Sequence, residues 1–333
     1  MIIDVHAHHI APQLLEELEG SGERYGVRLD RTEEPYGQAV FPGGRKSRPF
    51  FPKLCELEKR IPTLDEFAID KQLVSTWTDV AGYDLAPDQG AAWARLQNDT
   101  MAESLVTHPD RFLMMATLPM QDMDAALREM DYVVNEYDVC AFEVGTSVNE
   151  RPIGEEEFHP FWKKANELGA FVLLHPPLTP IGLDRLNRYF FKNLLGYPMD
   201  TTVAGASLIF SGLIDRLTDV KILLAHGGGF LPYGFARWDH GFKVNPDCRA
   251  DSTTRPAALV DRFYYDTIVY DQRILELLLR VAPPDHVLYG TDYPFEMFDD
   301  GAVERVRSLP GLEASDVSNI LGGNASQLLE RGS

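Results

Sequence analysis

Two histidines separated by one residue, His6 and His8, end the first apolar run of the chain. Side chains on a strand alternate between faces, so both imidazoles point the same way and can bind one metal ion. Further ligands should then stand at the ends of later strands. Three later apolar runs end in suitable residues, which are His175, His226 and Asp292. The sequence therefore predicts a metal site built from several strand ends.

A set of three histidines and an aspartate suits Zn(II) or another borderline divalent metal. Three or four protein ligands leave a position for water or substrate, which is typical of a catalytic site. Three glycines follow His226, so a loop or ligand can approach its backbone closely. His226 then has two candidate roles, as a fourth metal ligand or as an acid/base beside a metal-bound water. Asp292 can combine metal ligation with proton transfer.

Taken one at a time, these residues have simpler interpretations. A lone His-x-His pair arises by chance, and His175 or Asp292 alone is typical of a helix cap or a satisfied polar group. Their shared position at strand ends favours the joint metal site. The other histidines do not fit the pattern and are interpreted as structural or surface residues: His9, His108, His159, His240 and His286.

Basic residues lie on predicted loops that follow two of the strands. Arg45, Lys46 and Arg48 come in a long segment after the first strand, and Arg237 follows the sixth. Arginine forms bidentate pairs with carboxylates, so these residues are candidates for binding a carboxylated substrate. The alternative is that these residues are solvated charges on loops. That interpretation suits Arg45 and Lys46 better than Arg48 and Arg237.

Eight short apolar runs have the character of buried parallel strands. They are Ile2–Val5, Leu73–Trp77, Phe112–Thr117, Ala141–Val144, Phe171–Leu174, Lys221–Ala225, Phe263–Ile268 and Val287–Gly290. Helical patterns separate most of them, and one of these begins at Asp122, a candidate N-cap. This alternation predicts an α/β fold, a TIM-like (β/α)8 barrel in a single domain over residues 1–333. Inserts at 10–68, between strands 1 and 2, and at 176–203 should lie over the barrel mouth.

Composition excludes several classes of protein. With 31 basic and 51 acidic residues the net charge is -20, which argues against nucleic-acid binding. Three separated cysteines predict a reducing compartment without a thiolate metal site. We find neither a signal peptide nor an apolar run of the ~18 residues that span a bilayer. The expected location is cytoplasmic, with no membrane partner.

The motifs together resemble the amidohydrolase superfamily. They are Asp4-x-His6-x-His8, His175-Pro176, His226-Gly227-Gly228-Gly229 and Gly290-Thr291-Asp292-Tyr293-Pro294. Within it the chain looks like the branch of metal-dependent decarboxylases that includes aminocarboxymuconate-semialdehyde decarboxylase, and the similarity runs nearly end to end. The chain departs from that branch at His9-Ile10-Ala11-Pro12 and at Pro177, which are mouth positions.

The resemblance implies roles for individual residues. It implies one Zn(II), or Mn(II) as in some members, held by residues that match His6, His8, His175 and Asp292. It makes His226 the acid/base. It implies that Arg48 and Arg237 bind the substrate carboxylates, and that Arg237 reaches the site of a neighbouring subunit in a homodimer. Phe295 matches an aromatic residue beside the last metal ligand.

The predicted function is metal-dependent, non-oxidative decarboxylation of a small carboxylated aromatic or muconate-semialdehyde-type substrate. The same site could instead hydrolyse a lactone or amide, or hydrate a dicarboxylic enol. A non-catalytic, metal-stabilised binding protein is a further alternative, and it would require a closed metal site.

Overall fold

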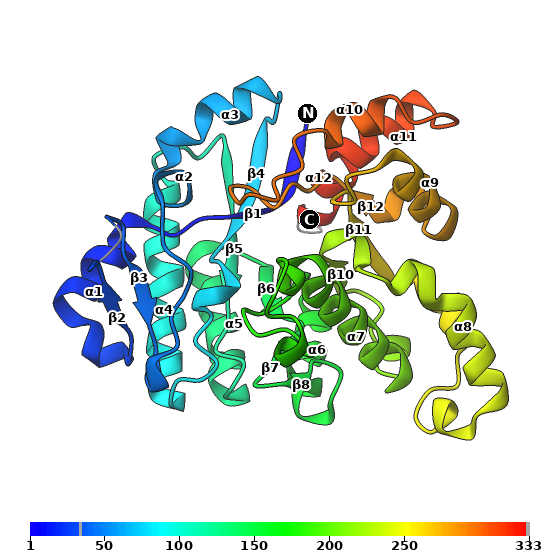
Figure 1. Cartoon of the computed structure of the whole chain (residues 1–333), viewed down its shortest axis with the longest axis horizontal. Helices are drawn as coiled ribbons and strands as arrows, with labels where there is room; N and C mark the ends of the chain where they lie inside the picture. The colour runs from blue at the N-terminus through cyan, green and yellow to red at the C-terminus, as the bar shows by residue number, and fades with distance from the viewer. Residues whose placement is uncertain (33–34, 331–333) are drawn as a thin grey trace.

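Eight parallel strands form the centre of the molecule in the computed structural model, which describes residues 1–32 and 35–330 (Figure 1). They pair in the order β1-β4-β5-β6-β9-β10-β11-β12. Their bounds are β1 (Ile3–His8), β4 (Lys71–Ser75), β5 (Phe112–Thr117), β6 (Ala141–Gly145), β9 (Phe171–His175), β10 (Lys221–Leu224), β11 (Phe263–Asp266) and β12 (Val287–Leu288). The Val5 N–H donates to the Tyr289 carbonyl at 3.0 Å and the Asp292 N–H to the His6 carbonyl at 2.9 Å, which closes the sheet. The predicted barrel is confirmed.

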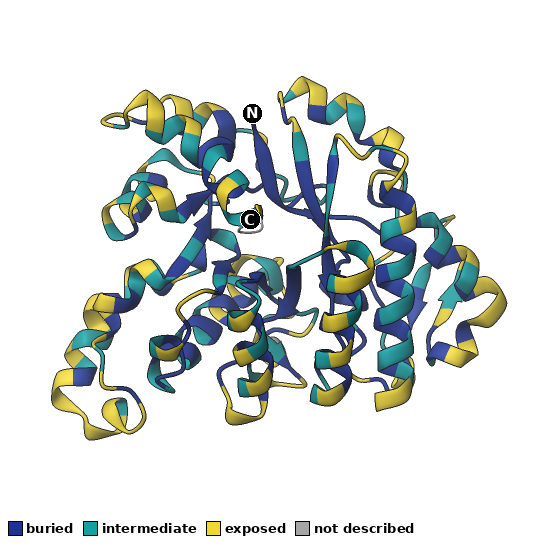
Figure 2. Ribbon diagram, turned by 180° about the vertical axis from the view of Figure 1, so that it is seen from behind, coloured by how far each residue is buried: buried dark blue, intermediate teal, exposed yellow. Residues whose placement is uncertain are grey.

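Helices surround the barrel. They are α1 (Pro12–Tyr25), α2 (Pro52–Cys55), α3 (Ile61–Glu66), α4 (Pro87–Leu105), α5 (Met123–Tyr137), α6 (His159–Glu167), α7 (Tyr197–Phe210), α8 (Leu231–Val244), α9 (Gln272–Val281), α10 (Ala302–Arg307), α11 (Ala314–Ser318) and α12 (Asn324–Leu329). The predicted N-cap of α5 is confirmed, because the Asp122 carboxylate accepts the Ala125 N–H at 2.8 Å. In Figure 2 the strands are buried, whereas the helices expose their outer faces. No helix in the described ranges combines the length and hydropathy needed to cross a bilayer.

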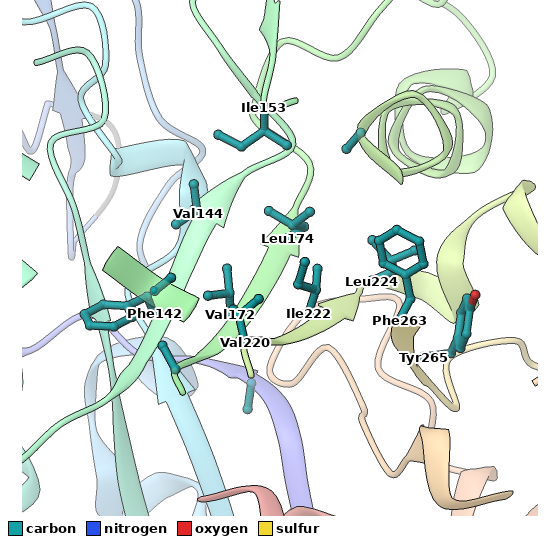
Figure 3. Close-up of a cluster of buried hydrophobic side chains, with 14 of the residues drawn as sticks. Phe142, Val144, Ile153, Val172, Leu174, Val220, Ile222, Leu224, Phe263 and Tyr265 are labelled. Atoms are coloured by element: carbon teal, nitrogen blue, oxygen red, sulfur yellow. The ribbon is translucent and has the colours of Figure 1, made fainter. Parts of the chain in front are cut away.

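Side chains of the strands alternate between two hydrophobic clusters. Phe142, Val172 and Ile222 join the cluster that faces the helices, which Figure 3 shows for β6, β9, β10 and β11. Phe171 and Leu173 join the cluster inside the barrel. This alternation directs His175 of β9 to the same side as Phe171 and Leu173. On β1 the register shifts between Asp4 and Ala7, so Val5 lies in the interior cluster and Ala7 in the outer one.

The insert over 10–68 covers the mouth only in part. Helix α1 packs beside α4, and the hairpin of β2 (Arg28–Asp30) and β3 (Gln38–Val40) follows it on the outside of the barrel (Figure 1). Its later portion, which contains Arg48 and Phe51, contacts Phe295 at the mouth. The placement of the rest of the insert over the mouth stays a prediction.

A buried polar network ties this insert to the metal-site strands. The fully buried Arg60 donates from Nη1 to the His8 carbonyl at 2.7 Å and from Nη2 to Gln72 Oε1 at 3.0 Å. Asp4 Oδ2 in turn accepts Gln72 Nε2 at 2.7 Å and the Thr291 hydroxyl at 2.6 Å. Burial raises the pKa of Asp4 to about 6 and lowers that of Arg60 to about 10.

We expect Arg60→Ala to lower the free energy of unfolding by about 3 kcal/mol, because it leaves buried acceptors unpaired. Urea denaturation measures this loss. Arg28→Ala is the matched control, since Arg28 is exposed in the same insert. Equal losses in the two variants would show that the network does not stabilise the fold.

Candidate metal centre

Five side chains from four strand ends converge at the barrel mouth. His6 and His8 belong to β1, His175 ends β9, and His226 and Asp292 follow β10 and β12 closely. The ring centroid of His175 lies 5.0 Å from that of His6, 4.9 Å from that of His8 and 5.4 Å from that of His226. The structure thus brings together all five residues that the sequence predicts for the metal site and its acid/base.

The donor atoms of this group fit a metal ion. The Nε2 atoms of His6, His8 and His175 and Oδ1 of Asp292 are buried without a hydrogen-bond partner in the described structure. Asp292 Oδ1 lies 3.7 Å from His6 Nε2 and 3.4 Å from His8 Nε2. Buried polar atoms are rarely left unpaired, and a cation among these lone pairs would satisfy all four. Ligand atoms of His6, His175, His226 and Asp292 also lie within 4.8 Å of one another, so His226 is close enough to be a ligand itself.

Hydrogen bonds on the far side of two rings point their Nε2 atoms inward. His6 Nδ1 lies 2.8 Å from Asp266 Oδ2, a carboxylate at the end of β11. His175 Nδ1 lies 2.9 Å from its neighbour's carbonyl, that of Pro176, and 3.1 Å from the Thr78 hydroxyl. An acceptor at Nδ1 places the ring proton there and leaves Nε2 as the free ligand atom.

The contacts that orient the His8 ring are longer than those of His6 and His175. Its Nδ1 lies 3.3 Å from the Ser75 hydroxyl and 3.5 Å from Glu143 Oε2. Burial lowers the pKa of His8, but the charge of Glu143 and contacts with Asp292 outweigh it and raise the pKa to about 9. The negative charge that retains this proton also attracts a cation, which would release the proton on binding.

Burial lowers the pKa of His6, but the hydrogen bond and charge of Asp266 and the charge of Asp292 outweigh it and raise the pKa. The pKa values of His175 and Asp292 shift downwards. Burial and the neighbouring imidazoles hold the pKa of His175 well below its usual range, so the ring is neutral and ready to bind a metal. Burial raises the pKa of Asp292, but the close approach of His226 and His8 and the charges of the nearby imidazoles hold it well below the usual range. Asp292 therefore carries its charge within the cluster.

His226 sits on a strained turn. Its φ is 57°, a left-handed conformation that costs a non-glycine residue free energy. The Asp266 carboxylate holds the turn by accepting the N–H groups of His226 at 2.9 Å and Gly227 at 2.7 Å. Nδ1 of His226 has no described partner, Nε2 lies 3.6 Å from Asp292 Oδ2, and 13% of the side chain is exposed. This imidazole borders the cluster and is partly accessible.

Aromatic side chains and one arginine form the wall beside His8. The Phe295 ring lies 5.4 Å from the His8 ring, 4.7 Å from that of Trp77 and 6.1 Å from that of Phe51. The Arg48 guanidinium carbon lies 4.1 Å from the Trp77 centroid and 5.2 Å from that of Phe295. The structure therefore places Arg48 and Phe295 at the mouth, as the sequence predicts.

Arg237 lies elsewhere. It is exposed on α8, which extends away from the barrel in Figure 1, and we find no contact between its side chain and the cluster within the described chain. Its substrate role, which the resemblance assigns to the site of a neighbouring subunit, stays a prediction.

Comparison with known proteins agrees with this geometry. The sequence profile of the amidohydrolase family matches residues 3–331. The chain belongs to the amidohydrolase family. This amidohydrolase is 30% identical to 2-amino-3-carboxymuconate-6-semialdehyde decarboxylase of Dictyostelium discoideum over 332 residues, which cover 98% of this chain and 91% of the relative. The predicted family and branch are confirmed.

Two solved structures share the fold of this amidohydrolase. The 5-carboxyvanillate decarboxylase of Sphingomonas paucimobilis has a TM-score of 0.82 at 23% identity, with 99% of each chain covered. A dihydroxybenzoic acid decarboxylase of Polaromonas sp., solved with manganese and the inhibitor 2-nitroresorcinol, has a TM-score of 0.78 at 23% identity. The alignment with it covers 99% of this chain and 97% of that chain.

Sequence reasoning missed three supporting residues of the amidohydrolase site. Asp266 follows Tyr265 in the seventh predicted strand, Glu143 lies near the end of the fourth, and Thr78 follows the second. A search for every acidic or hydroxyl residue near a strand end would have found them.

We expect Asp266→Asn to weaken metal binding by about 10- to 100-fold. The amide has only one acceptor oxygen, so its NH2 group faces either His6 Nδ1 or the backbone N–H groups of the His226 turn. Competition with a chelator, followed by metal analysis, measures the affinity. Asp261→Asn, an exposed change before the same strand, is the control. An affinity equal to that of the control would mean that Asp266 does not support the site.

Proposed function

We propose that this amidohydrolase is a metal-dependent, non-oxidative decarboxylase of a small carboxylated aromatic or muconate-semialdehyde-type substrate. The observation that carries the proposal is the cluster of buried, unpaired ligand atoms beside a partly accessible His226. A closed structural site would leave no accessible acid/base at its edge. The full-length similarity to an aminocarboxymuconate-semialdehyde decarboxylase selects decarboxylation among the reactions that such a site supports.

His6, His8, His175 and Asp292 are the proposed metal ligands. Their nitrogen and oxygen donors suit Zn(II), and Mn(II) is the second candidate because the Polaromonas structure contains manganese. A bound divalent ion would supply Lewis-acid polarisation of a substrate oxygen or activation of a water.

His226 is the proposed acid/base, with Asp292 as its partner. When CO2 leaves, the carbon that carried it keeps the bonding electrons and must receive a proton. His226 is placed to deliver that proton, since its ring borders the proposed metal cluster and is partly accessible. The Asp292 carboxylate, 3.6 Å from His226 Nε2, stabilises the imidazolium before the transfer.

Arg48 and Phe295 are the proposed substrate contacts of the same subunit, and Arg237 that of a second subunit in a homodimer. Exposed apolar side chains support such a dimer, because large exposed patches are typical of interfaces. They occur on α8 and on the segment that precedes α7: Tyr189, Phe190, Leu194, Leu195, Phe230 and Tyr233. The Phe230 N–H donates to Thr202 Oγ1 at 2.8 Å, so the residue before α8 contacts α7, the helix that follows this segment. The acidic composition and separated cysteines still predict a cytoplasmic location.

Measuring CO2 release by the metal-loaded protein tests the function. A panel of hydroxybenzoates and muconate acids should include at least one substrate that releases CO2 in proportion to its loss. Acid formation from lactones or amides without CO2 would favour hydrolysis, and water addition to a dicarboxylic enol would favour a hydratase. Either outcome would contradict the proposal if the protein is fully loaded with metal and releases no CO2 from any acid of the panel.

A further inference from the structure

Arg48 is already paired with a carboxylate. Its Nε lies 3.0 Å from Asp79 Oδ2, its Nη2 lies 3.2 Å from Asp79 Oδ1, and its backbone N–H also donates to Oδ2 at 3.2 Å. Asp79 is only 1% exposed, whereas 40% of the Arg48 side chain is accessible. The face of the guanidinium that suits a bidentate carboxylate is therefore occupied by the protein itself.

An incoming carboxylate would have to displace Asp79 or approach with it still in place. Displacement would leave a buried charge without its partner, which is costly. If the pair stays intact, Nη1 of Arg48 remains available as a hydrogen-bond donor. Asp79 already offsets the positive charge of the guanidinium, however. Arg48 can thus orient a substrate without supplying the net charge that a second carboxylate needs.

The other charges near Arg48 and the metal cluster support this conclusion. A second cation, Lys192, is half-buried and interacts electrostatically with Asp79 and Arg48, and burial lowers its pKa. The carboxylates of the site itself are those of Asp292, Asp266 and Glu143, all buried. With Asp79, these side chains of one subunit carry four negative and two positive charges, and a divalent metal ion would make the group neutral before any charge from a second subunit is added. A second substrate carboxylate would then find no unpaired cation among them.

One aromatic ring beside the pair is partly accessible. Phe295 is half-buried and lies against Trp77 with ring centroids 4.7 Å apart, and the guanidinium of Arg48 covers the Trp77 ring. Trp77 itself is only 1% exposed, so Phe295 is the ring of this pair that a planar substrate can contact.

We propose that Asp79 is a specificity-determining residue, which offsets the charge of Arg48 so that the pocket takes planar substrates with one carboxylate and discriminates against a second. This inference rests on the proposed decarboxylase function. It selects monocarboxylic aromatic acids over dicarboxylates such as aminocarboxymuconate semialdehyde.

The test compares 2-hydroxybenzoate with 2-hydroxyisophthalate, which differ by one carboxylate, on wild-type enzyme and on Asp79→Asn. The asparagine keeps the shape and one acceptor but removes the charge. We expect the ratio of kcat/KM for the dicarboxylate over the monocarboxylate to rise about ten-fold or more in the variant. Asp65→Asn is the matched control, because Asp65 pairs with Arg111 at the end of the barrel opposite the mouth and should leave the ratio unchanged.

Dissociation constants provide a second reading that does not need turnover. They are measured on metal-loaded wild-type enzyme under conditions without conversion, or on a metal-loaded inactive variant. Wild-type enzyme that binds the dicarboxylate as tightly as the monocarboxylate would overturn the inference. A ratio that Asp79→Asn leaves unchanged would also overturn it, since Asp79 would then only orient Arg48 for any carboxylate. Absence of CO2 with both acids would instead count against the decarboxylase function, while the binding ratio would still test Asp79.

Discussion

Replacing His226 with alanine should leave the metal content at the wild-type level and reduce kcat by roughly 10³-fold, within the range typical of a lost acid/base. The expectation follows from the position of the ring. Its Nε2 faces Asp292 at 3.6 Å, and 13% of the side chain is exposed. The other three imidazoles each have a buried, unpaired Nε2 directed into the cluster. Loss of His226 therefore removes a proton donor but leaves four metal ligands.

Metal analysis and steady-state kinetics on the same preparation separate the two roles of His226. His240→Ala, an exposed change on α8, is the matched control and should be as active as wild type. A His226→Ala enzyme that loses its metal would make this residue a ligand, which its distance from the other ligand atoms permits. A metal-loaded His226→Ala enzyme with normal kcat would contradict the acid/base role.

The barrel and the metal cluster could be predicted because both depend on short-range patterns. The run Phe112–Thr117 was predicted from its apolar residues alone and matches β5 residue for residue. Once strands are placed, a polar residue at the end of each must reach the mouth, which brings His175 and Asp292 together across 117 residues of sequence. The alternation of side chains along each strand accounts for most of this placement.

Features that depend on tertiary contacts could not be predicted in this way. Asp79 pairs with Arg48 across 31 positions, and no local pattern links a loop aspartate to an arginine in an insert. Asp266 and Glu143 each stand in an apolar run, where a single acidic residue predicts no partner. Helix α8 has Pro232 in its first turn, and glycines at 234 and 241 obscure its helical pattern.

Replacing His6 with alanine should abolish stable metal binding, with a loss of affinity greater than about 100-fold. Losing a direct ligand weakens metal binding more than losing a residue that only orients a ligand. The metal stabilises only the folded state, so its loss also removes stability. At a metal concentration about 1,000 times the dissociation constant that stabilisation is about 4 kcal/mol. His6→Ala should therefore melt at the same temperature with and without added metal, whereas wild type should melt higher with metal.

His9→Ala provides a matched control from the same segment. His9 is also fully buried, but its nitrogens bond to the Leu54 carbonyl and the Ser104 hydroxyl, both at 2.9 Å. Burial and the charge of Arg60 lower its pKa to about 3, so the ring is neutral and structural. His9→Ala should lose stability equally with and without metal and still respond to metal as wild type does. If His6→Ala also kept the metal-dependent rise in melting temperature, β1 would not supply the ligand that the unpaired Nε2 of His6 indicates.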